Sequence, residues 1–265
     1  MDLRIKNEKL VVPGLQHTYR ILHITDAHMC PDSPLDSEEV RRNAQYSRME
    51  WTDEEFGLTL EEMFLRLAAY GSENHVDMCV LSGDIADFLS PGIVECMTGL
   101  LEQAGCCLYV PGNHETDDDC VLFSAFAEDP QMQIAELGEL RLVGVNNADH
   151  MVTDAVLDKL ETTLNSDKPV ILVNHVPLVT PSLIEGVDAF WGKGTTHFWF
   201  GGVNAEDPRV QRYLTLLQRT QTRLAAVMAG HVHFAHTDTF ENGVVQYVGG
   251  AGCNGHVRLL TVSGE

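Results

Sequence analysis

The chain has 265 residues and is strongly acidic, with 39 Asp and Glu residues against 17 Lys and Arg, for a formal net charge of −22. This charge disfavours large contacts with nucleic-acid polymers and anionic membranes, because both are themselves negatively charged. Hydrophobic residues make up 44% of the sequence, enough for one large core, and we expect a single domain that spans residues 1–265.

Short apolar runs predict strands along the whole chain. The first two, at 3–6 and 10–12, suggest a hairpin that turns at Asn7 and Glu8. Continuous apolar runs, which are typical of buried strands, then follow at Ile21–Thr25, Met78–Ser82, Leu108–Val110, Val170–Val173 and Leu224–Met228. The end of the chain is β-rich, with strands at 237–240, 244–248 and 257–262 and a turn at Asn242-Gly243.

Helices are expected between several of these strands. Each begins at a residue that caps helix N-termini or at a Pro that suits the first turn. The expected starting points are Thr52 or Thr59, Ser90 with Pro91, Thr153, and Asp207 with Pro208. Apolar residues follow each start at helical spacing. Helices that alternate with strands in this way indicate an α/β fold.

Residues of the types that bind metals follow each of the five buried strands. They are Asp26, His28, Asp84, Asn113, His175, His231 and His233. Open α/β sheets build their sites at the carboxyl ends of strands, so we expect these side chains to converge on one crevice. A mixture of carboxylate, amide and imidazole ligands suits Mn, Fe, Zn or Co better than Ca or Mg. The sequence therefore predicts a transition-metal site.

The motifs that carry these residues resemble those of the metallophosphoesterase (calcineurin-like phosphoesterase) superfamily. They are Asp-Ala-His at 26–28, Gly-Asp-Ile-Ala-Asp at 83–87, Gly-Asn-His-Glu at 112–115, His175, and Gly-His-Val-His at 230–233. All occur in the family's order, from about residue 20 to the C-terminus, and each follows a predicted strand, as a meaningful motif match requires. The resemblance implies a four-layer αββα sandwich of two mixed β-sheets flanked by helices.

The resemblance also implies two divalent or trivalent transition-metal ions (Mn, Fe or Zn). One ion would be held by Asp26, His28 and His233, the other by Asn113, His175 and His231, and Asp84 would bridge them. Such a pair lowers the pKa of a bridging water and clamps the oxygens of an in-line displacement at phosphorus. The expected reaction is hydrolysis of a phosphate ester by a metal-bridging hydroxide.

Two further residues have expected catalytic roles. The family resemblance makes His114, directly after the Asn113 ligand, the proton donor to the leaving oxygen and a stabiliser of charge in the transition state. Asp87 follows the bridging carboxylate by three residues and could orient the His114 imidazole through its second nitrogen. Alternatively, Asp87 is a plain surface or helix N-terminal carboxylate. The remaining histidines match no motif, and we expect structural or surface roles for them.

Two segments stand outside the predicted scaffold and are expected to be substrate-side insertions, because loops on a rigid sheet carry specificity. Segment 29–57 contains Arg41, Arg42 and Arg48, which could hold phosphate or form a solvated helix face. Segment 182–206 is rich in aromatic residues among glycines. It could stack a base or an aromatic leaving group, pack on itself, or form a homodimer contact.

Three functions are compatible with these motifs. The leading one is a phosphodiesterase or phosphomonoesterase that acts on a small-molecule phosphate ester. A protein Ser/Thr phosphatase is the alternative, but that branch continues the second motif with Arg-Gly, whereas here Phe88 and Leu89 follow Asp87. The third is a non-catalytic metal-binding interaction scaffold, against which the intact ligands and His114 argue.

Features of the sequence outside these motifs favour a cytoplasmic location. Residues 1–20 carry Arg4, Lys6 and Lys9 among their apolar positions and lack the continuous apolar run of a signal peptide. No later run approaches the roughly 18 apolar residues of a membrane span. The chain has 7 cysteines, an odd number without a metal-type Cys-x-x-Cys, as expected in a reducing compartment.

Overall fold

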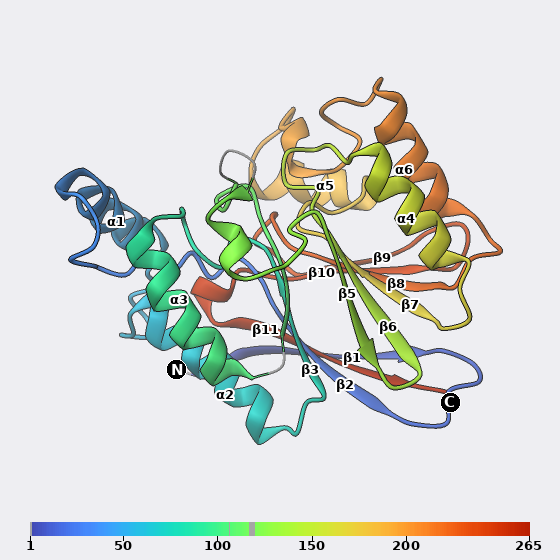
Figure 1. The fold of residues 1–265 in the computed structure, drawn as a ribbon, viewed down its shortest axis with the longest axis horizontal. Coiled ribbons are helices and arrows are strands. Elements are labelled where there is room, and N and C mark those ends of the chain that lie inside the picture. Colours follow the sequence, from blue (N-terminus) through green and yellow to red (C-terminus); the bar gives the residue numbers. More distant parts are fainter. Residues whose placement is uncertain (1, 106, 117–119) are drawn as a thin grey trace.

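The computed structural model of the protein describes residues 2–105, 107–116 and 120–265. Its strands form two sheets that pack against each other, and helices cover the outer face of each sheet (Figure 1). Both sheets contain parallel and antiparallel neighbours. The expected four-layer αββα sandwich is therefore confirmed.

The first sheet has five strands in the order β1-β11-β2-β3-β4. Their bounds are β1 Arg4–Val11, β11 His256–Ser263, β2 Tyr19–Ile24, β3 Met78–Ser82 and β4 Cys107–Val110. Strands β2, β3 and β4 are parallel neighbours, while β11 runs antiparallel to β2 and parallel to β1. The parallel strands end at the same edge of the sheet, where the first three motifs begin.

The expected hairpin at Asn7 and Glu8 is wrong, because β1 continues through both residues and pairs in parallel with β11. A strand at the edge of a sheet tolerates polar side chains on its open face. Glu8 also has a partner there: it accepts a hydrogen bond of 2.9 Å from buried Arg258. Arg258 donates in turn to the Val248 carbonyl oxygen in the second sheet at 2.6 Å. Glu8 therefore helps to satisfy a buried charge that links the two sheets.

The second sheet has six strands in the order β5-β6-β7-β8-β10-β9. Their bounds are β5 Met132–Leu137, β6 Leu140–Val145, β7 Val170–Val173, β8 Leu224–Ala229, β10 Val245–Val248 and β9 His236–Thr239. The antiparallel pairing of β9 with β10 confirms the predicted turn at Asn242-Gly243. The hairpin of β5 and β6, which turns through Gly138 in a left-handed conformation, was not predicted.

Helices α2 and α3 lie against the first sheet and α4 and α6 against the second, while α1 lies beyond α3, away from the strands, and α5 contacts β9 (Figure 1). Their bounds are α1 Glu38–Trp51, α2 Leu60–Glu73, α3 Pro91–Ala104, α4 Asp154–Leu164, α5 Pro181–Phe190 and α6 Pro208–Gln218. The predicted starts at Ser90, Thr153 and Asp207 are confirmed as N-caps. Thr59, and not Thr52, caps α2, through a capping box with Glu62.

Three layers of apolar side chains hold these elements together. The layer between the sheets contains Ile21, Val80 and Val110 of the first sheet and Ile171 and Met228 of the second. A second layer lies between the first sheet and helices α2 and α3, and a third between the second sheet and helices α4 and α6. Central strands are therefore buried on both faces, which explains why they appear in the sequence as continuous apolar runs.

Candidate metal centre

The loops that leave the central strands hold several ligand-type residues in an unusual backbone conformation. Asp26, His28, Asp84, His231 and His233 have φ angles of 52°, 46°, 50°, 73° and 63°. Left-handed backbone is uncommon for residues other than glycine, and where it clusters it often marks a functional site. These sharp turns direct the side chains back into the space beyond the strand ends.

Two motif glycines permit the close approach of these loops. A Cβ atom on Gly112 would overlap the carboxylate and backbone nitrogen of Asp84, and one on Gly230 would overlap the Thr25 hydroxyl and the Asp26 carboxylate. Any side chain at either position would separate strand ends that carry ligand-type residues. The glycines of Gly-Asn-His and Gly-His-x-His are therefore required by packing.

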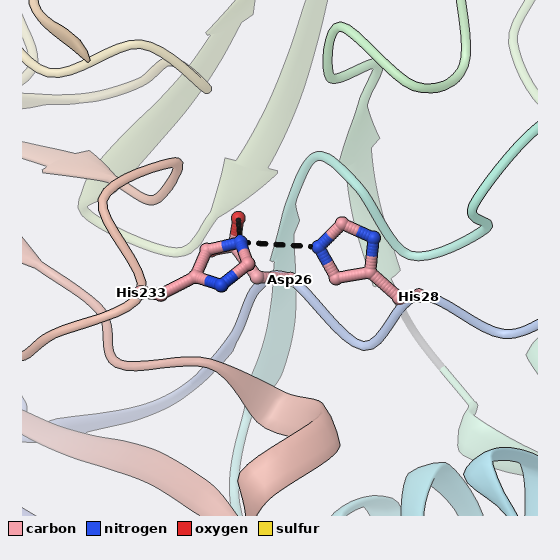
Figure 2. A group of neighbouring side chains, drawn as sticks. All are labelled: Asp26, His28 and His233. Carbon is pink, nitrogen blue, oxygen red and sulfur yellow. Dashed lines mark hydrogen bonds and ion pairs between the residues drawn. The ribbon is translucent and has the colours of Figure 1, made fainter. Parts of the chain in front are cut away.

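Asp26, His28 and His233 form the first group of ligand-type side chains (Figure 2). The two Nε2 atoms of His28 and His233 lie 3.1 Å apart, and His233 Nε2 lies 3.5 Å from the Asp26 carboxylate. Asp26 is fully buried, and it accepts hydrogen bonds from the Thr25 hydroxyl at 2.8 Å and from the backbone N–H of His231. These contacts hold the carboxylate toward the two imidazoles.

Asp84, Asn113, His175 and His231 form the second group. His175 Nε2 lies 3.1 Å from Asp84 Oδ2, 3.0 Å from Asn113 Oδ1 and 3.2 Å from His231 Nδ1. Asp84, His175 and His231 are buried, while Asn113 is exposed at the mouth of the site. The structure thus brings together all seven residues predicted as ligands, with Asp84 beside His175 and His231.

The outer nitrogens of three imidazoles face groups that accept hydrogen bonds. His175 Nδ1 lies 2.8 Å from the Ser82 carbonyl oxygen, His28 Nδ1 3.0 Å from the Asp87 carboxylate, and His231 Nε2 3.0 Å from the His197 carbonyl oxygen. Each outer nitrogen must therefore carry the proton, which leaves the inner nitrogen of a neutral ring with a lone pair directed into its group. Imidazole lone pairs and carboxylates that converge in this way fit a bound cation.

In the second group, the Asp84 carboxylate favours a positive charge beside it, which His175 carries here. Burial opposes ionisation of both His175 and Asp84, yet the Asp84 carboxylate raises the pKa of His175 to about 9 and the imidazole holds the pKa of Asp84 well below its usual range. For His231 and His233, burial lowers the pKa, so these rings are neutral and able to bind a metal ion.

His114 and Asp87 lie beside the first group and contact each other. His114 Nδ1 is 3.1 Å from Asp87 Oδ1 and 2.9 Å from the Asp87 carbonyl oxygen. Burial disfavours the imidazolium, but the Asp87 and Asp84 carboxylates outweigh it and raise the pKa of His114 to about 9. The His114 side chain is 34% exposed, against 9% for Asp87. His114 is therefore the more accessible of the two, and these contacts fix its ring against Asp87.

Sequence reasoning missed several residues that support the site. Glu115 is fully buried and accepts hydrogen bonds from the backbone N–H groups of Asp84, Ala86 and Gly112 and from the Tyr109 hydroxyl. Glu115 therefore connects the second and third motifs by hydrogen bonds. Its place as the last residue of Gly-Asn-His-Glu was the sequence feature that could have identified it. Burial, followed by the charge of Asp84, raises the pKa of Glu115 to about 7.

Trp51 was also missed, because it lies in the segment expected to select substrate. Its indole N–H donates to Asp87 Oδ1 at 2.8 Å, and its ring stacks on that of His28 with a centroid separation of 4.2 Å. Of the three arginines in the same segment, Arg48 donates to the Cys30 carbonyl oxygen at 2.6 Å, whereas Arg41 and Arg42 are exposed on α1.

The aromatic segment 182–206 borders the other side of the site. Trp191 and Phe198 stack with centroids 5.0 Å apart, and Phe198 lies 5.3 Å from the His231 ring. The Trp191 N–H donates to the Val232 carbonyl oxygen at 2.9 Å. The segment is thus largely packed on itself and on the loop that carries His231 and His233. Phe190 and Trp191 nevertheless remain 57% and 39% exposed.

The fold is an α/β sandwich with two groups of metal-type side chains at the carboxyl ends of its strands. The chain belongs to the calcineurin-like phosphoesterase family, whose model matches residues 19–235, and it is accordingly a hydrolase of phosphate esters. No curated protein sequence matches the chain. Among the described residues, no helix is long and apolar enough to span a membrane.

Solved structures share this fold at low sequence identity. A dimetal phosphatase from Danio rerio is similar with a TM-score of 0.58 and 12% identity, over 89% of this chain and 88% of that one. The purple acid phosphatase PPD1 from yellow lupin (Lupinus luteus) is similar with a TM-score of 0.60 and 15% identity, over 92% of this chain and 46% of that one.

Proposed function

We propose that the protein is a dinuclear metal-dependent phosphoesterase that hydrolyses a phosphate mono- or diester of a small organic molecule. The observation that carries the proposal is the convergence of two ligand groups, with His114 beside them. Asp26, His28 and His233 would hold one Mn, Fe or Zn ion. Asn113, His175 and His231 would hold the other, and Asp84 would bridge the two. When bound, such a pair polarises the phosphate and activates water for in-line attack.

In this proposal His114 supplies the proton for the leaving group, and Asp87 orients the His114 ring. His114 uses Nδ1 for its contacts with Asp87, which leaves Nε2 to donate a proton to the departing oxygen. Its imidazolium form is favoured by the neighbouring carboxylates, so the proton is available near neutral pH. The His114 backbone N–H also donates to Asp84 Oδ1 at 2.9 Å. That bond fixes the carboxylate next to the proton donor.

The surroundings of the site favour a small organic phosphate over a phosphoprotein. Exposed Phe190 and Trp191 lie beside the loop that carries His231 and His233, and they offer apolar rings to the organic part of an ester. Phe88 and Leu89 stand where the protein phosphatases have Arg-Gly. Segments 29–57 and 182–206 both border the site, and we assign the substrate-facing surface to them.

A substrate panel tests this proposal. Purified protein loaded with Mn is assayed against chromogenic phosphate monoesters, chromogenic diesters, nucleotide-like esters and a phosphoserine peptide. We expect turnover of at least one class of small ester and little turnover of the peptide. Preferred turnover of the peptide would favour the protein phosphatase alternative. Stoichiometric metal without turnover of any ester would favour the non-catalytic scaffold.

A further inference from the structure

Helix α1 turns an unusual face toward the site. Ala44, Ser47, Arg48 and Trp51 recur at intervals of three and four residues and so share one side of the helix. Ala44 is the one residue of α1 classed as buried. The other three make specific polar contacts: Arg48 with the Cys30 carbonyl oxygen, and Ser47 and Trp51 with the Asp87 side chain. This face of α1 therefore contributes mainly polar contacts with Asp87 and the Cys30 carbonyl oxygen, and buries little apolar surface.

Trp51 contacts Asp87, the residue that also contacts His114, the proposed proton donor. Asp87 Oδ1 accepts from Trp51 Nε1 at 2.8 Å, and the same oxygen lies 3.0 Å from His28 Nδ1 and 3.1 Å from His114 Nδ1. The indole plane is inclined by only 18° to the His28 ring and lies 5.2 Å, centroid to centroid, from His233. One side chain therefore touches both the carboxylate that orients His114 and a proposed metal ligand.

We propose that Trp51, supplied by α1 outside the family motifs, is a positioning residue for the hydrolysis, acting on His114 through Asp87. This inference rests on the proposed function. The Asp87 oxygen must face two imidazoles at once, and rotation of the carboxylate would release one of them. An indole N–H is a donor that does not ionise near neutral pH, so it can fix that oxygen without competing for the transferred proton. Stacking on His28 adds a second constraint.

The Trp51→Phe variant removes the N–H donor and keeps an aromatic ring on His28. Partners in the outer shell of such sites typically affect activity or metal affinity by about 10- to 100-fold. We expect Trp51→Phe to retain two ions per chain by elemental analysis and to lower kcat about 10-fold on esters with poor leaving groups. KM should change less than about twofold, because Trp51, unlike the exposed residues of segment 29–57, contacts Asp87 and His28. Nitrophenyl esters, which need little proton donation, should lose less.

Two comparisons separate positioning from a general structural effect. Tyr70→Phe removes one hydroxyl from helix α2, outside the two segments assigned to the substrate, and should leave kcat unchanged. In an Asp87→Ala background the indole has no carboxylate to hold, so adding Trp51→Phe should cause little further loss of kcat. Trp51→Ala also removes the stacking and should weaken Mn binding about 10-fold, measured by titration of metal-free protein.

The outcomes distinguish this inference from the function on which it rests. If the wild-type protein binds metal but hydrolyses no ester, the proposed function is wrong. If the wild-type protein is active and Trp51→Phe keeps kcat within twofold on every ester, the positioning role is wrong. An additive loss in the Asp87→Ala background would likewise contradict action through Asp87.

Discussion

At the scale of single residues, the metal-type ligands could be predicted from sequence because each follows a strand that is buried on both faces. The motifs named both the residues and their order, and the structure gathers them within short distances of one another. The contacts of Trp51 with Asp87 and His28 could not be predicted. Trp51 is distant from these residues in sequence, and no local pattern specifies where the end of α1 packs.

Asp84 is the residue whose loss should affect both ions. Asp84→Asn removes a negative charge from a buried position between the two proposed ions, and we expect lower occupancy of both sites and almost no hydrolysis. Elemental analysis of the purified variant measures this directly. Exposed Asp167 provides the control, since Asp167→Asn should retain both ions. Two undisturbed ions in Asp84→Asn would show that Asp84 does not bridge them.

His114 should matter for turnover without holding metal. His114→Ala removes the proposed proton donor, so kcat should fall by roughly 10²- to 10⁴-fold, the usual contribution of a positioned acid or base. Both ions should remain, because the His114 side chain meets only the edge of the His28 ring among the proposed ligands, and the variant keeps the backbone bond to Asp84. Kinetics on a series of esters with different leaving groups provide the test. Equal losses across the series would argue against proton donation by His114.

At the scale of elements, helices with an apolar stripe and strands with a continuous apolar run were predictable, whereas an edge strand and a helix with polar inner contacts were not. Helices α2, α3, α4 and α6 each combine an N-cap with an apolar stripe, and all were expected. Strand β5 alternates buried and open positions at the edge of its sheet, so it lacks a continuous apolar run. Helix α1 has almost no apolar stripe, because its inner face carries polar contacts with the site.

The end of α5 should influence substrate affinity. Phe190→Ala removes an exposed ring at the rim of the site, and an aromatic contact of about 0.5–1.5 kcal/mol corresponds to a rise in KM of roughly 2- to 10-fold. The rise should appear for esters with an aromatic or nucleobase group and not for small alkyl esters, with both metals retained. Ile134→Ala, at a 42% exposed position on β5, serves as the control. An unchanged KM for every aromatic ester would show that Phe190 does not contact the substrate.

At the scale of the whole molecule, each ligand group draws residues from both sheets. Asp26, His28, Asp84 and Asn113 follow strands of the first sheet, and His175, His231 and His233 follow strands of the second. Bound ions would therefore connect the sheets at this edge, as the hydrogen bond from Arg258 to the Val248 carbonyl oxygen does elsewhere. The sequence alone could place ligands at strand ends, but it did not assign each strand to a sheet.

Metal removal should lower the thermal stability of the protein. A ligand at 100 times its Kd stabilises the folded state by about 2.7 kcal/mol per site, which corresponds to a change in Tm of roughly 5–10 °C for a chain of this size. Calorimetry of chelated protein with and without added Mn measures the shift. His114→Ala should show the same shift as wild type. A Tm that does not respond to verified metal loss would contradict the connection between the sheets.

The central claim is that two ions act together in hydrolysis, and titration of activity against bound metal tests it most directly. Metal-free protein is loaded in steps with Mn, and the ions per chain and the hydrolysis of a small chromogenic ester are measured on the same samples. We predict negligible turnover without metal and a maximum reached at two ions per chain. Full turnover by metal-free protein, or a maximum reached at one ion, would contradict the account.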